Sequence, residues 1–394
     1  MRIGIDASRA VRPEQTGTET YSLHIIRALL HTQQDHREHH LILYAHAALP
    51  IDLLIGTEAS RSSSLCSGTG STETTGACTI RVIPFPRLWT HVRLNWELRR
   101  RPPDLLFIPA HVMPVACPVP AVVTVHDLGY LYYPEAHRAF DRWYLHWSTR
   151  RHARLAACIV ADSQATKEDL VQHYGANAAR VRVVYPAYDE TLQRVENPQI
   201  IAAVKARYSI RGDYLLHLGT LQPRKNLFRL IEAFARVQLS GSPSGDGVFQ
   251  LVLAGKKGWD YEALARLVDK MGLQNRVIFT GYVAPGDKAA LLSGAQALVF
   301  PSLYEGFGIP VLEAMACGVP VLTSRVSSLP EVAGDAAVLV DPLDVDDIAA
   351  GLRQIVCQSD LRHTLIARGY QQVQKFSWHR AAQQLWEVFD SALA

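Results

Sequence analysis

The chain has 394 residues, of which 48% are hydrophobic and 20% are charged, with 25 Gly and 21 Pro. This composition is typical of a globular protein and excludes a collagen, a coiled coil and a fully disordered chain, and the length predicts two or three domains. The formal net charge of +3, from 40 Lys and Arg against 37 Asp and Glu, excludes nucleic acid as a partner held by bulk charge, so any anion site is local.

The sequence contains no pattern typical of a membrane-spanning helix, a secretory signal or closely spaced cysteine pairs. No apolar run approaches the roughly 20 residues that a membrane-spanning helix needs. Residues 1–7 lead into an apolar segment with no basic region or cleavage-like site before it, so we expect a cytoplasmic protein. The cysteines at positions 66, 78, 117, 158, 317 and 357 form no Cys-x-x-Cys pair. They suggest neither a zinc site nor a disulfide framework.

Short apolar runs alternate with helical patterns along the chain. In the first half the runs are 3–5, 41–44, 105–108 and 121–125, and a helical pattern covers 20–30. In the second half the runs are 214–218, 249–254, 277–279, 297–300, 319–323 and 337–340, with helical patterns over 227–239 and 261–271. This alternation is typical of βαβ units with parallel, buried strands. Because it occurs twice, the sequence predicts an α/β protein with two Rossmann-like, doubly wound parallel-sheet domains.

The domain boundary falls in a polar stretch, from Pro186 to about Tyr208, that has few strand signals. We therefore predict an N-terminal domain over 1–190 and a second domain over 191–376. In the remaining segment, 377–394, apolar residues recur near helical spacing from Trp378 to Leu393. That pattern predicts a helix that packs back towards the N-terminal domain.

Two stretches are predicted to be surface loops. In Ser60 to Thr79, 14 of 20 residues are Ser, Thr or Gly, a composition that buries too little apolar surface to offset its ordering entropy. Ser240 to Gly247 is a shorter loop of the same kind.

The richest site signal is FPSLYEGFGIPVLEAMACGVPVLT, residues 300–323. A strand leads into a turn that contains Gly306 and Gly308, and Pro310 then opens a helix that ends at Gly318. Glu305 precedes this helix and Glu313 lies in its first turns, so both carboxylates border the edge where parallel sheets bind ligands. Backbone N–H groups of the turn would stabilise a phosphate there. The alternative is that the two acids are a solvated loop residue and a complement to the helix dipole.

A second cluster favours the ligand site over that alternative. The segment HLGTLQPRKN, residues 217–226, connects a strand to a helix and places Arg224 and Lys225 at the same edge of the sheet. Two fixed cations can neutralise a pyrophosphate, each contributing on the order of 4 kcal/mol at about 4 Å before desolvation. No metal is then needed.

These segments resemble the donor-binding domain of the large retaining glycosyltransferase family 4 (glycosyltransferase group 1), which has the two-Rossmann GT-B fold. The resemblance rests on the pair Glu305-x7-Glu313, its context EGFGIPVLEAMACGVPV and the upstream GTLQPRKN. It covers nearly the whole chain and is strongest over 214–343. Within the family, VHDLGYLYYPEAH (125–137) and ADSQATKEDL (161–170) are similar to the branch that contains O-antigen mannosyltransferases.

The resemblance implies a role for each matching residue around a nucleotide sugar. Glu313 is expected to bind the ribose hydroxyls, since a carboxylate accepts two hydrogen bonds from a vicinal diol. Glu305 is expected to contact hydroxyls of the donor sugar, and Arg224 and Lys225 to contact the diphosphate. The remaining implied contacts are backbone groups of Gly306, Phe307, Gly308 and Ile309 to sugar and phosphate, and Tyr282 and Val283 to the base.

Two further positions come from the N-terminal half. The family's glycine-rich loop corresponds to TGTETY, residues 16–21, where Gly17 remains but Glu19 and Thr20 depart from the family pattern. His126 follows the strand 121–125, where a histidine is either structural or, as the resemblance implies, beside the anomeric region of the donor. The catalytic candidates are therefore His126 and Glu305. His126 need not be a general base, because the leaving diphosphate can accept the acceptor's proton.

The reaction that the resemblance implies is transfer of a hexose, mannose from GDP-mannose, to a glycan or lipid-linked acceptor in cell-surface polysaccharide biosynthesis. The configuration would be retained, and the enzyme would need no metal or other cofactor. Three alternatives stay open: a UDP-sugar-dependent glycosyltransferase, a sugar-nucleotide epimerase of the same fold, and a non-catalytic nucleotide-sugar-binding module.

Two other patterns need an interpretation. Asp344-Val345-Asp346 has the form of a metal-binding DxD but precedes a helical pattern, where Asp is a helix cap or first-turn acid. The stretches 87–101 and 138–154 each hold five Arg against one acid, with four Trp interleaved. They are either solvated helix faces or a surface for anionic lipid or a lipid-diphosphate acceptor, which would make the protein peripheral at the inner face of the plasma membrane.

Overall fold

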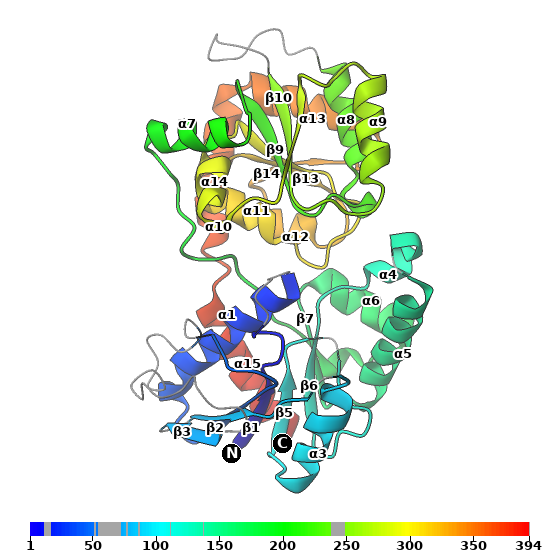
Figure 1. The fold of residues 1–394 in the computed structure, drawn as a ribbon, viewed down its shortest axis with the longest axis vertical. Coiled ribbons are helices and arrows are strands. Elements are labelled where there is room, and N and C mark those ends of the chain that lie inside the picture. The colour runs from blue at the N-terminus through cyan, green and yellow to red at the C-terminus, as the bar shows by residue number, and fades with distance from the viewer. Residues whose placement is uncertain are drawn as a thin grey trace. The chain divides into compact units, whose positions relative to one another are not determined.

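The computed structural model divides the chain into two compact units with one sheet each (Figure 1). The structure describes residues 1–11, 17–50, 53, 72–75, 78–85, 87–110, 112–136, 138–237 and 249–393. The first unit comprises Met1–Leu128, Ala139–Pro186 and Trp378–Ala394, and the second comprises Gly129–Arg138 and Ala187–Ser377. The domain boundaries predicted from the sequence placed residues 129–138 in the N-terminal domain. In the structure these residues make their contacts mainly within the second unit.

The first unit contains a sheet in the order β3-β4-β2-β1-β5-β6-β7-β8. Its strands are β1 (Arg2–Asp6), β2 (His40–Ala45), β3 (Thr72–Thr75), β4 (Cys78–Val82), β5 (Leu105–Ile108), β6 (Ala121–Val125), β7 (Cys158–Ala161) and β8 (Val181–Val183). All neighbouring pairs are parallel except β3 with β4. The helices are α1 (Gly17–Thr32), α3 (Asn95–Arg100), α5 (Ala139–Leu155), α6 (Gln164–Tyr174) and α15 (Trp378–Leu393).

The second unit contains a parallel sheet in the order β11-β10-β9-β12-β13-β14. Its strands are β9 (Tyr214–Leu218), β10 (Gln250–Ala254), β11 (Val277–Gly281), β12 (Ala297–Phe300), β13 (Val321–Ser324) and β14 (Ala337–Val340). Its helices are α4 (Gly129–Tyr132), α7 (Pro198–Arg207), α8 (Leu227–Arg236), α9 (Tyr261–Lys270), α10 (Pro285–Ser293), α11 (Ile309–Ala316), α12 (Leu329–Ala333), α13 (Val345–Cys357) and α14 (Ser359–Val373).

Both sheets have the buried strands that the apolar runs predicted. The central strands of each sheet are buried along their length because helices cover both faces. The predicted α/β class with two doubly wound parallel sheets is therefore confirmed. In each sheet all strands at the centre stay parallel, but the order in which the chain adds strands reverses at one point, between β1 and β5 in the first unit and between β9 and β12 in the second. Loops that follow these strands diverge, which opens a crevice for a ligand.

The prediction of a loop over Ser60 to Thr79 is wrong at its C-terminal end. Thr72–Thr75 forms the antiparallel edge strand β3, and Cys78 and Thr79 begin β4. Threonine is enriched in strands, and backbone pairing with β4 gives this polar segment its place in the sheet. Residues 60–71 and the second predicted loop, Ser240 to Gly247, lie outside the described residues.

The last helix, α15, packs with α1 in the first unit. Trp386 is fully buried, and its indole N–H donates to Thr32 Oγ1 at 2.9 Å. Among the residues that the structure describes, every helix is too short or too polar to cross a lipid bilayer.

Candidate nucleotide-sugar site

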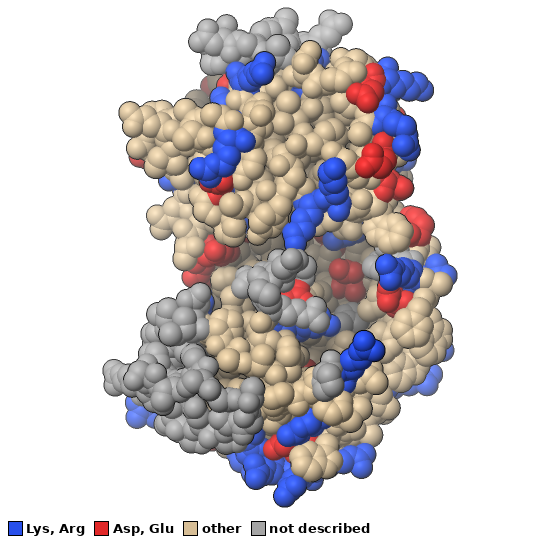
Figure 2. All heavy atoms as spheres, in the orientation of Figure 1, with Lys and Arg blue, Asp and Glu red and all other residues tan. Residues whose placement is uncertain are grey.

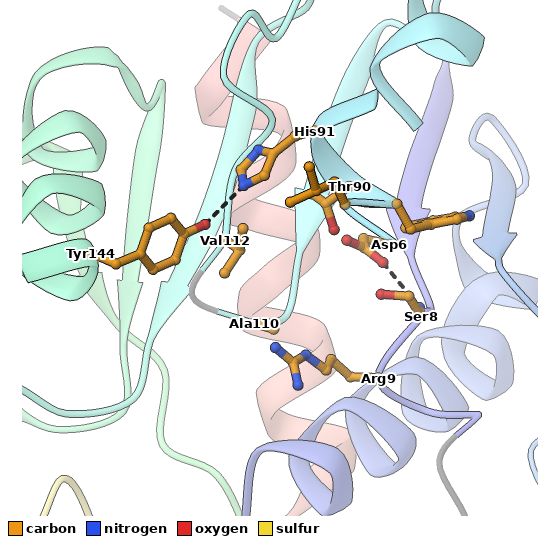
Figure 3. A pocket seen from close by; sticks show the side chains of 10 residues that line it. Asp6, Ser8, Arg9, Thr90, His91, Ala110, Val112 and Tyr144 are labelled. Carbon is orange, nitrogen blue, oxygen red and sulfur yellow. Dashed lines mark hydrogen bonds between the residues drawn. The ribbon is translucent and has the colours of Figure 1, made fainter. Parts of the chain in front are cut away.

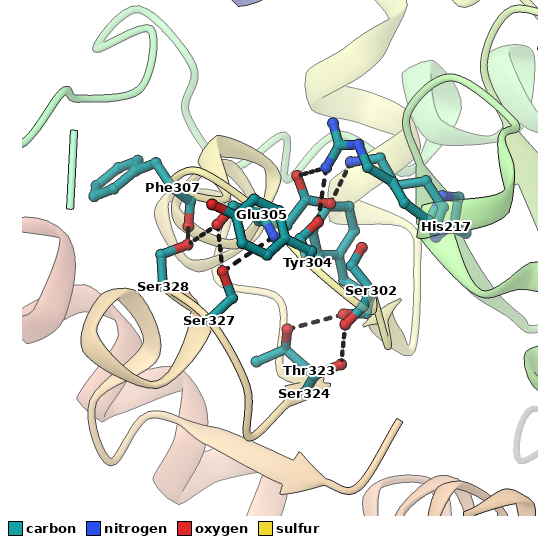
Figure 4. A network of polar contacts seen from close by, with 12 residues as sticks. His217, Ser302, Tyr304, Glu305, Phe307, Thr323, Ser324, Ser327 and Ser328 are labelled. Carbon is teal, nitrogen blue, oxygen red and sulfur yellow. Dashed lines mark hydrogen bonds and ion pairs between the residues drawn. The ribbon is translucent and has the colours of Figure 1, made fainter. Parts of the chain in front are cut away.

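The reversal point of the second unit brings the two sequence clusters together. The loop after β9 carries the short helix Pro223–Lys225, and the loop after β12 carries Glu305. Arg224 Nη1 donates to Glu305 Oε2 and Lys225 Nζ to Glu305 Oε1, each at 2.5 Å. A single carboxylate therefore lies between two cations whose residues are 81 and 80 positions away in the chain (Figure 4).

Burial and charge act in opposite directions on Glu305. Its residue is 5% exposed, and burial alone would raise the pKa of the carboxyl. The adjacent Arg224 and Lys225 outweigh burial and hold its pKa at about 2. The carboxylate is thus charged at neutral pH, and each oxygen retains a second lone pair for a hydroxyl donor.

The turn that carries Glu305 is fixed by two serines from the segment before α12. Ser327 Oγ donates to the Glu305 carbonyl at 2.6 Å, and Ser328 Oγ lies 2.9 Å and 2.8 Å from the carbonyls of Glu305 and Phe307 (Figure 4). Gly308 then caps α11 with a φ of 110°. This φ strains any residue with a side chain, and a Cβ at Gly308 would also lie 2.8 Å from Leu329 Cδ2 and displace that side chain, so the backbone favours glycine here.

Glu313 lies on α11 and is also buried, but it has a different partner. Lys288 Nζ, from α10, donates to Glu313 Oε1 at 2.5 Å. The sequence analysis did not name Lys288. Since α10 follows Tyr282 and Val283, this ion pair connects the expected ribose-binding acid with the expected base-binding loop. Tyr282 itself is 62% exposed, with Lys256 Nζ 5.3 Å from the centroid of its ring.

His217 lies beneath this cluster, in β9 (Figure 4). It is fully buried, its Nδ1 lies 3.1 Å from the Val299 carbonyl, and its ring stacks on Phe300. Burial and the nearby Lys225 lower the pKa of His217 to about 4. The imidazole is therefore neutral under physiological conditions, and Lys225 extends over the Phe300 ring at 4.5 Å. The imidazole next to Lys225 is thus uncharged, and Glu305 is the acid that pairs with Lys225.

The structure also locates the other residues that the sequence analysis assigned to the nucleotide-sugar site. Gly306, Phe307 and Gly308 form the turn, and Ile309 begins α11. Gly17 is in the first unit, as the first residue of α1, exposed and with open space around its Cα. The predicted loop TGTETY is thus wrong over residues 17–21, which begin α1, and Thr16 lies outside the described residues. Glu19, which replaces the family's glycine, is buried and pairs with Arg9 at 3.2 Å.

The interpretation of Asp344 as a helix cap is confirmed. Its Oδ1 accepts from the backbone N–H groups of Asp346 and Asp347 at the start of α13. Asp346 is in turn paired with Arg236. Both carboxylates thus have the structural roles expected at a helix N-terminus.

The first unit has its own pocket at its own reversal point, which the sequence analysis did not predict. Its volume is about 230 Å³ (Figure 3). The lining residues are Asp6, Ser8, Arg9, Leu88, Trp89, Thr90, His91, Ala110, Val112 and Tyr144. Burial raises the pKa of Asp6, and His91 Nε2 is hydrogen-bonded to Tyr144 Oη at 2.8 Å. The pocket therefore combines a carboxyl, a guanidinium and aromatic walls.

His126 belongs to the same strand edge of the first unit. Its Nδ1 lies 2.7 Å from Asp162 Oδ2, which follows the neighbouring strand β7, and its Nε2 lies 3.1 Å from the Pro109 carbonyl. Burial lowers the pKa of His126, but Asp162, Asp127 and the Pro109 carbonyl together outweigh burial and raise it. Burial also raises the pKa of Asp162, which the nearby His126 opposes. Both ring nitrogens face acceptors, an arrangement that suits the doubly protonated, cationic ring. His126 is thus arranged as a donor rather than as a base.

The chain matches two family models. Residues 207–372 match the model described as glycosyl transferases group 1, and residues 71–192 match that of glycosyltransferase family 4. The first match covers Arg224, Lys225, Glu305 and Glu313, and the second covers His126 and Asp162.

Curated relatives include sugar transferases of bacteria. The O-antigen chain mannosyltransferase B of Escherichia coli is 34% identical over 266 residues, which cover 67% of this chain and 68% of that protein. The serotype-specific mannosyltransferase WbdA of Escherichia coli is 32% identical over 241 residues, but the chain spans only 29% of its length. The D-inositol 3-phosphate glycosyltransferase of Rhodococcus jostii is 30% identical over 249 residues, covering 59% of this chain and 52% of that protein.

Solved structures share the fold over the full chain. Sucrose-phosphate synthase from Thermosynechococcus elongatus has a TM-score of 0.71 at 19% identity, covering 99% of this chain and 98% of its own. Anabaena Alr3699/HepE in complex with UDP-glucose has the same score and identity, covering 99% of both chains. WaaG, a glycosyltransferase involved in lipopolysaccharide biosynthesis, has a TM-score of 0.66 at 18% identity, covering 98% of both chains. At these identities the similarity concerns the fold.

Proposed function

Because this chain belongs to the group 1, family 4 glycosyltransferases and has their GT-B fold, we propose that it transfers mannose from GDP-mannose to a glycan or lipid-linked acceptor. The product is a cell-surface polysaccharide, and the α configuration of the donor is retained. The observation that carries the proposal is the Glu305 carboxylate between Arg224 and Lys225 at the reversal point of the second sheet. This arrangement offers cations to a diphosphate and a carboxylate to the sugar next to it.

The proposed donor position follows from these contacts. The diphosphate lies against Arg224 and Lys225 and the N-terminus of α11, and the hexose lies over the turn with its hydroxyls donating to Glu305. The ribose hydroxyls donate to Glu313 in place of Lys288, and the base lies at Tyr282 and Val283. The bond between the anomeric carbon and the diphosphate breaks, the acceptor oxygen bonds to that carbon on the same face, and the acceptor's proton passes to the leaving diphosphate.

The cationic donors supply the charge stabilisation for this step. A guanidinium and an ammonium stabilise the developing charge on the leaving group, so the proposed step uses no metal and no other cofactor. His126, held by Asp162 and the Pro109 carbonyl, is proposed to flank the anomeric carbon and to act on the reacting sugar through the positive charge of its ring.

The acceptor is proposed to enter the 230 Å³ pocket of the first unit. That volume is below the roughly 300–1,000 Å³ of pockets that hold drug-sized ligands, so it suits one terminal sugar ring. Asp6 and Arg9 offer polar contacts to its hydroxyls, and Trp89 and Tyr144 offer aromatic faces to the ring.

We expect turnover with GDP-mannose and none with UDP-glucose or UDP-galactose when each is incubated with a lipid-diphosphate glycan in EDTA. NMR of the product should show an α linkage. Turnover restricted to a UDP-sugar would support a UDP-sugar as the donor instead. HepE, which shares the fold, has been solved in complex with UDP-glucose. A β linkage would contradict retention, a strict divalent-metal requirement would contradict the proposed step, and interconversion of the donor without transfer would indicate an epimerase.

Helix α5 is proposed as the surface that contacts a lipid-linked acceptor. Phe140 is 71% exposed, Trp143 59% and Trp147 37%, and exposed Arg150 and Arg154 continue the same face towards the end of the helix. Lys and Arg side chains also gather in Figure 2 where Figure 1 places α3. Aromatic groups beside arginines are typical of contacts with the interface of an anionic membrane.

We expect the protein to cosediment with vesicles that contain anionic lipid and not with neutral ones. A Trp143→Ser/Trp147→Ser variant should lose most of this binding, because exposed indoles supply the interfacial contact. The control variant is Tyr370→Ser, which removes an exposed aromatic side chain that does not belong to α5 but to the second unit. Equal binding by all three proteins would mean that the α5 face is merely solvated.

A further inference from the structure

A cluster of metal-binding donor atoms lies in the first unit, outside every site described above. His36, Glu38 and His39 occupy the turn between a short helix, Gln33–Asp35, and β2. One potential ligand atom of each residue, an imidazole nitrogen or a carboxylate oxygen, lies within 4.8 Å of those of the other two. Asp390, from α15 at the other end of the chain, adds a fourth donor 3.3 Å from His39 Nε2.

The spacing of these atoms matches ligands that share an ion. His39 Nε2 lies 3.2 Å from Glu38 Oε1, and His36 Nδ1 lies 3.6 Å from the same oxygen. In a tetrahedral zinc site with bonds of about 2.0–2.1 Å, neighbouring ligand atoms are about 3.3 Å apart. Two imidazole nitrogens and two carboxylate oxygens form a donor set suited to a divalent ion of the zinc type.

The alternative is that His39 simply forms ion pairs with the two acids. His39 is 6% exposed, and neither of its ring nitrogens makes a hydrogen bond, although two carboxylate oxygens lie within 3.3 Å of Nε2. The oxygens therefore lie to the side of the direction in which the N–H bond of Nε2 would point. In a metal site the ring nitrogen points at the ion, and the other ligand atoms lie to the side of that direction in the same way. A buried nitrogen without a partner is unfavourable, and an ion would supply the partner for Nε2.

The two imidazoles are already held in place for binding. The rings of His36 and His39 stack on Trp386 of α15, with centroids 4.7 Å and 5.4 Å away and interplanar angles of 21° and 9°. Trp386 is itself fixed by burial and by its hydrogen bond to Thr32. Ligand rings fixed by their surroundings lose little freedom when an ion binds.

We propose that His36, Glu38, His39 and Asp390 bind one divalent transition-metal ion, with Zn²⁺ as the representative ion. Because Asp390 and Trp386 belong to α15, the ion ties the C-terminal helix to the turn before β2. Its role is structural. It stabilises the first unit and takes no part in the transfer reaction, whose rate in EDTA is a separate measurement.

The test compares zinc binding by the full chain, untagged and stripped with EDTA, with that of a Glu38→Gln/Asp390→Asn variant. The two acids are 64% and 58% exposed, so their amides should not disturb folding. By calorimetry we expect one equivalent of Zn²⁺ to bind the unaltered chain, and binding to weaken about tenfold or more in the variant. Co²⁺ should give the intense visible bands of a tetrahedral site only in the unaltered chain.

The matched control is Asp35→Asn/Glu387→Gln, which removes one exposed acid from the short helix just before this turn and one from α15. This control should bind Zn²⁺ as the unaltered chain does, and Zn²⁺ should raise the melting temperature of both. No binding to the unaltered chain overturns the proposal. Equal affinities in the unaltered chain and the Glu38/Asp390 variant, or equal losses in the two variants, overturn it as well.

Discussion

An Arg224→Gln/Lys225→Gln variant is expected to bind its nucleotide sugar about 100-fold more weakly and to bind the free nucleoside nearly unchanged. Hydrogen bonds to charged groups contribute about 1.5–3 kcal/mol each, and each 1.4 kcal/mol corresponds to about tenfold in affinity. Only the diphosphate presents the charge that these residues contact. Calorimetry with GDP-mannose, GDP and guanosine measures the difference.

The same variant changes the ionisation of Glu305. In the unaltered protein the pKa of this buried carboxyl is about 2 because the two cations outweigh burial. Since this value is below the ordinary one of about 4.3, the ion pairs stabilise the second unit at neutral pH. The contribution is lost as pH falls through 4 towards 2. Without the cations, burial is unopposed and the carboxyl protonates at a higher pH.

The control for this prediction is Arg236→Gln/Lys270→Gln, which removes two exposed cations from helices of the same unit. Thermal unfolding of both variants separates loss of binding from loss of fold. If the Arg224/Lys225 variant lost affinity for nucleoside and diphosphate equally, the two residues would only support the turn. If it lost neither, the diphosphate would bind elsewhere.

Those parts of the fold that depend on local apolar pattern could be predicted from the sequence. The runs 214–218 and 297–300 became β9 and β12 because a strand buried on both faces must be apolar throughout. β3 could not be predicted in this way, since Thr72–Thr75 is polar and its order comes from pairing with β4. Helix α7, within the polar boundary stretch, begins with an Asn197 cap and a Pro198 start that the apolar pattern does not reveal.

The residues of the candidate site also fall into those that a local pattern could predict and those that it could not. Arg224, Lys225 and Glu305 were placed at one edge because each follows a predicted strand, and the structure joins them. Lys288 and Ser328 come from separate helical segments, and no local signal connects them with the site. Asp162 could have been found, since it follows β7 just as His126 follows β6, and neighbouring parallel strands end at the same edge.

An Asp162→Asn variant is expected to lower kcat about 10- to 100-fold, with donor affinity within about threefold of the unaltered protein. Asp162 accepts from His126 Nδ1 at 2.7 Å, and its negative charge is among the groups, with Asp127 and the Pro109 carbonyl, that raise the pKa of that imidazole against burial. Asparagine keeps an acceptor oxygen and removes the charge. The pKa of His126 then falls, since burial favours the neutral ring. Steady-state rates from pH 5 to 9, together with calorimetry of the donor, measure both effects.

The direction of the pH shift separates a functional role from a structural one. If the cationic ring orients the reacting sugar, activity is present below the pKa of His126 and is lost as pH rises through it. Asp162→Asn therefore moves the loss of activity to lower pH. Asp141→Asn, which removes an exposed acid from α5 of the same unit, should leave the profile in place. A uniform loss at every pH, accompanied by a lower melting temperature, would show that Asp162 only stabilises the fold, and an unchanged kcat would remove His126 from the proposed step.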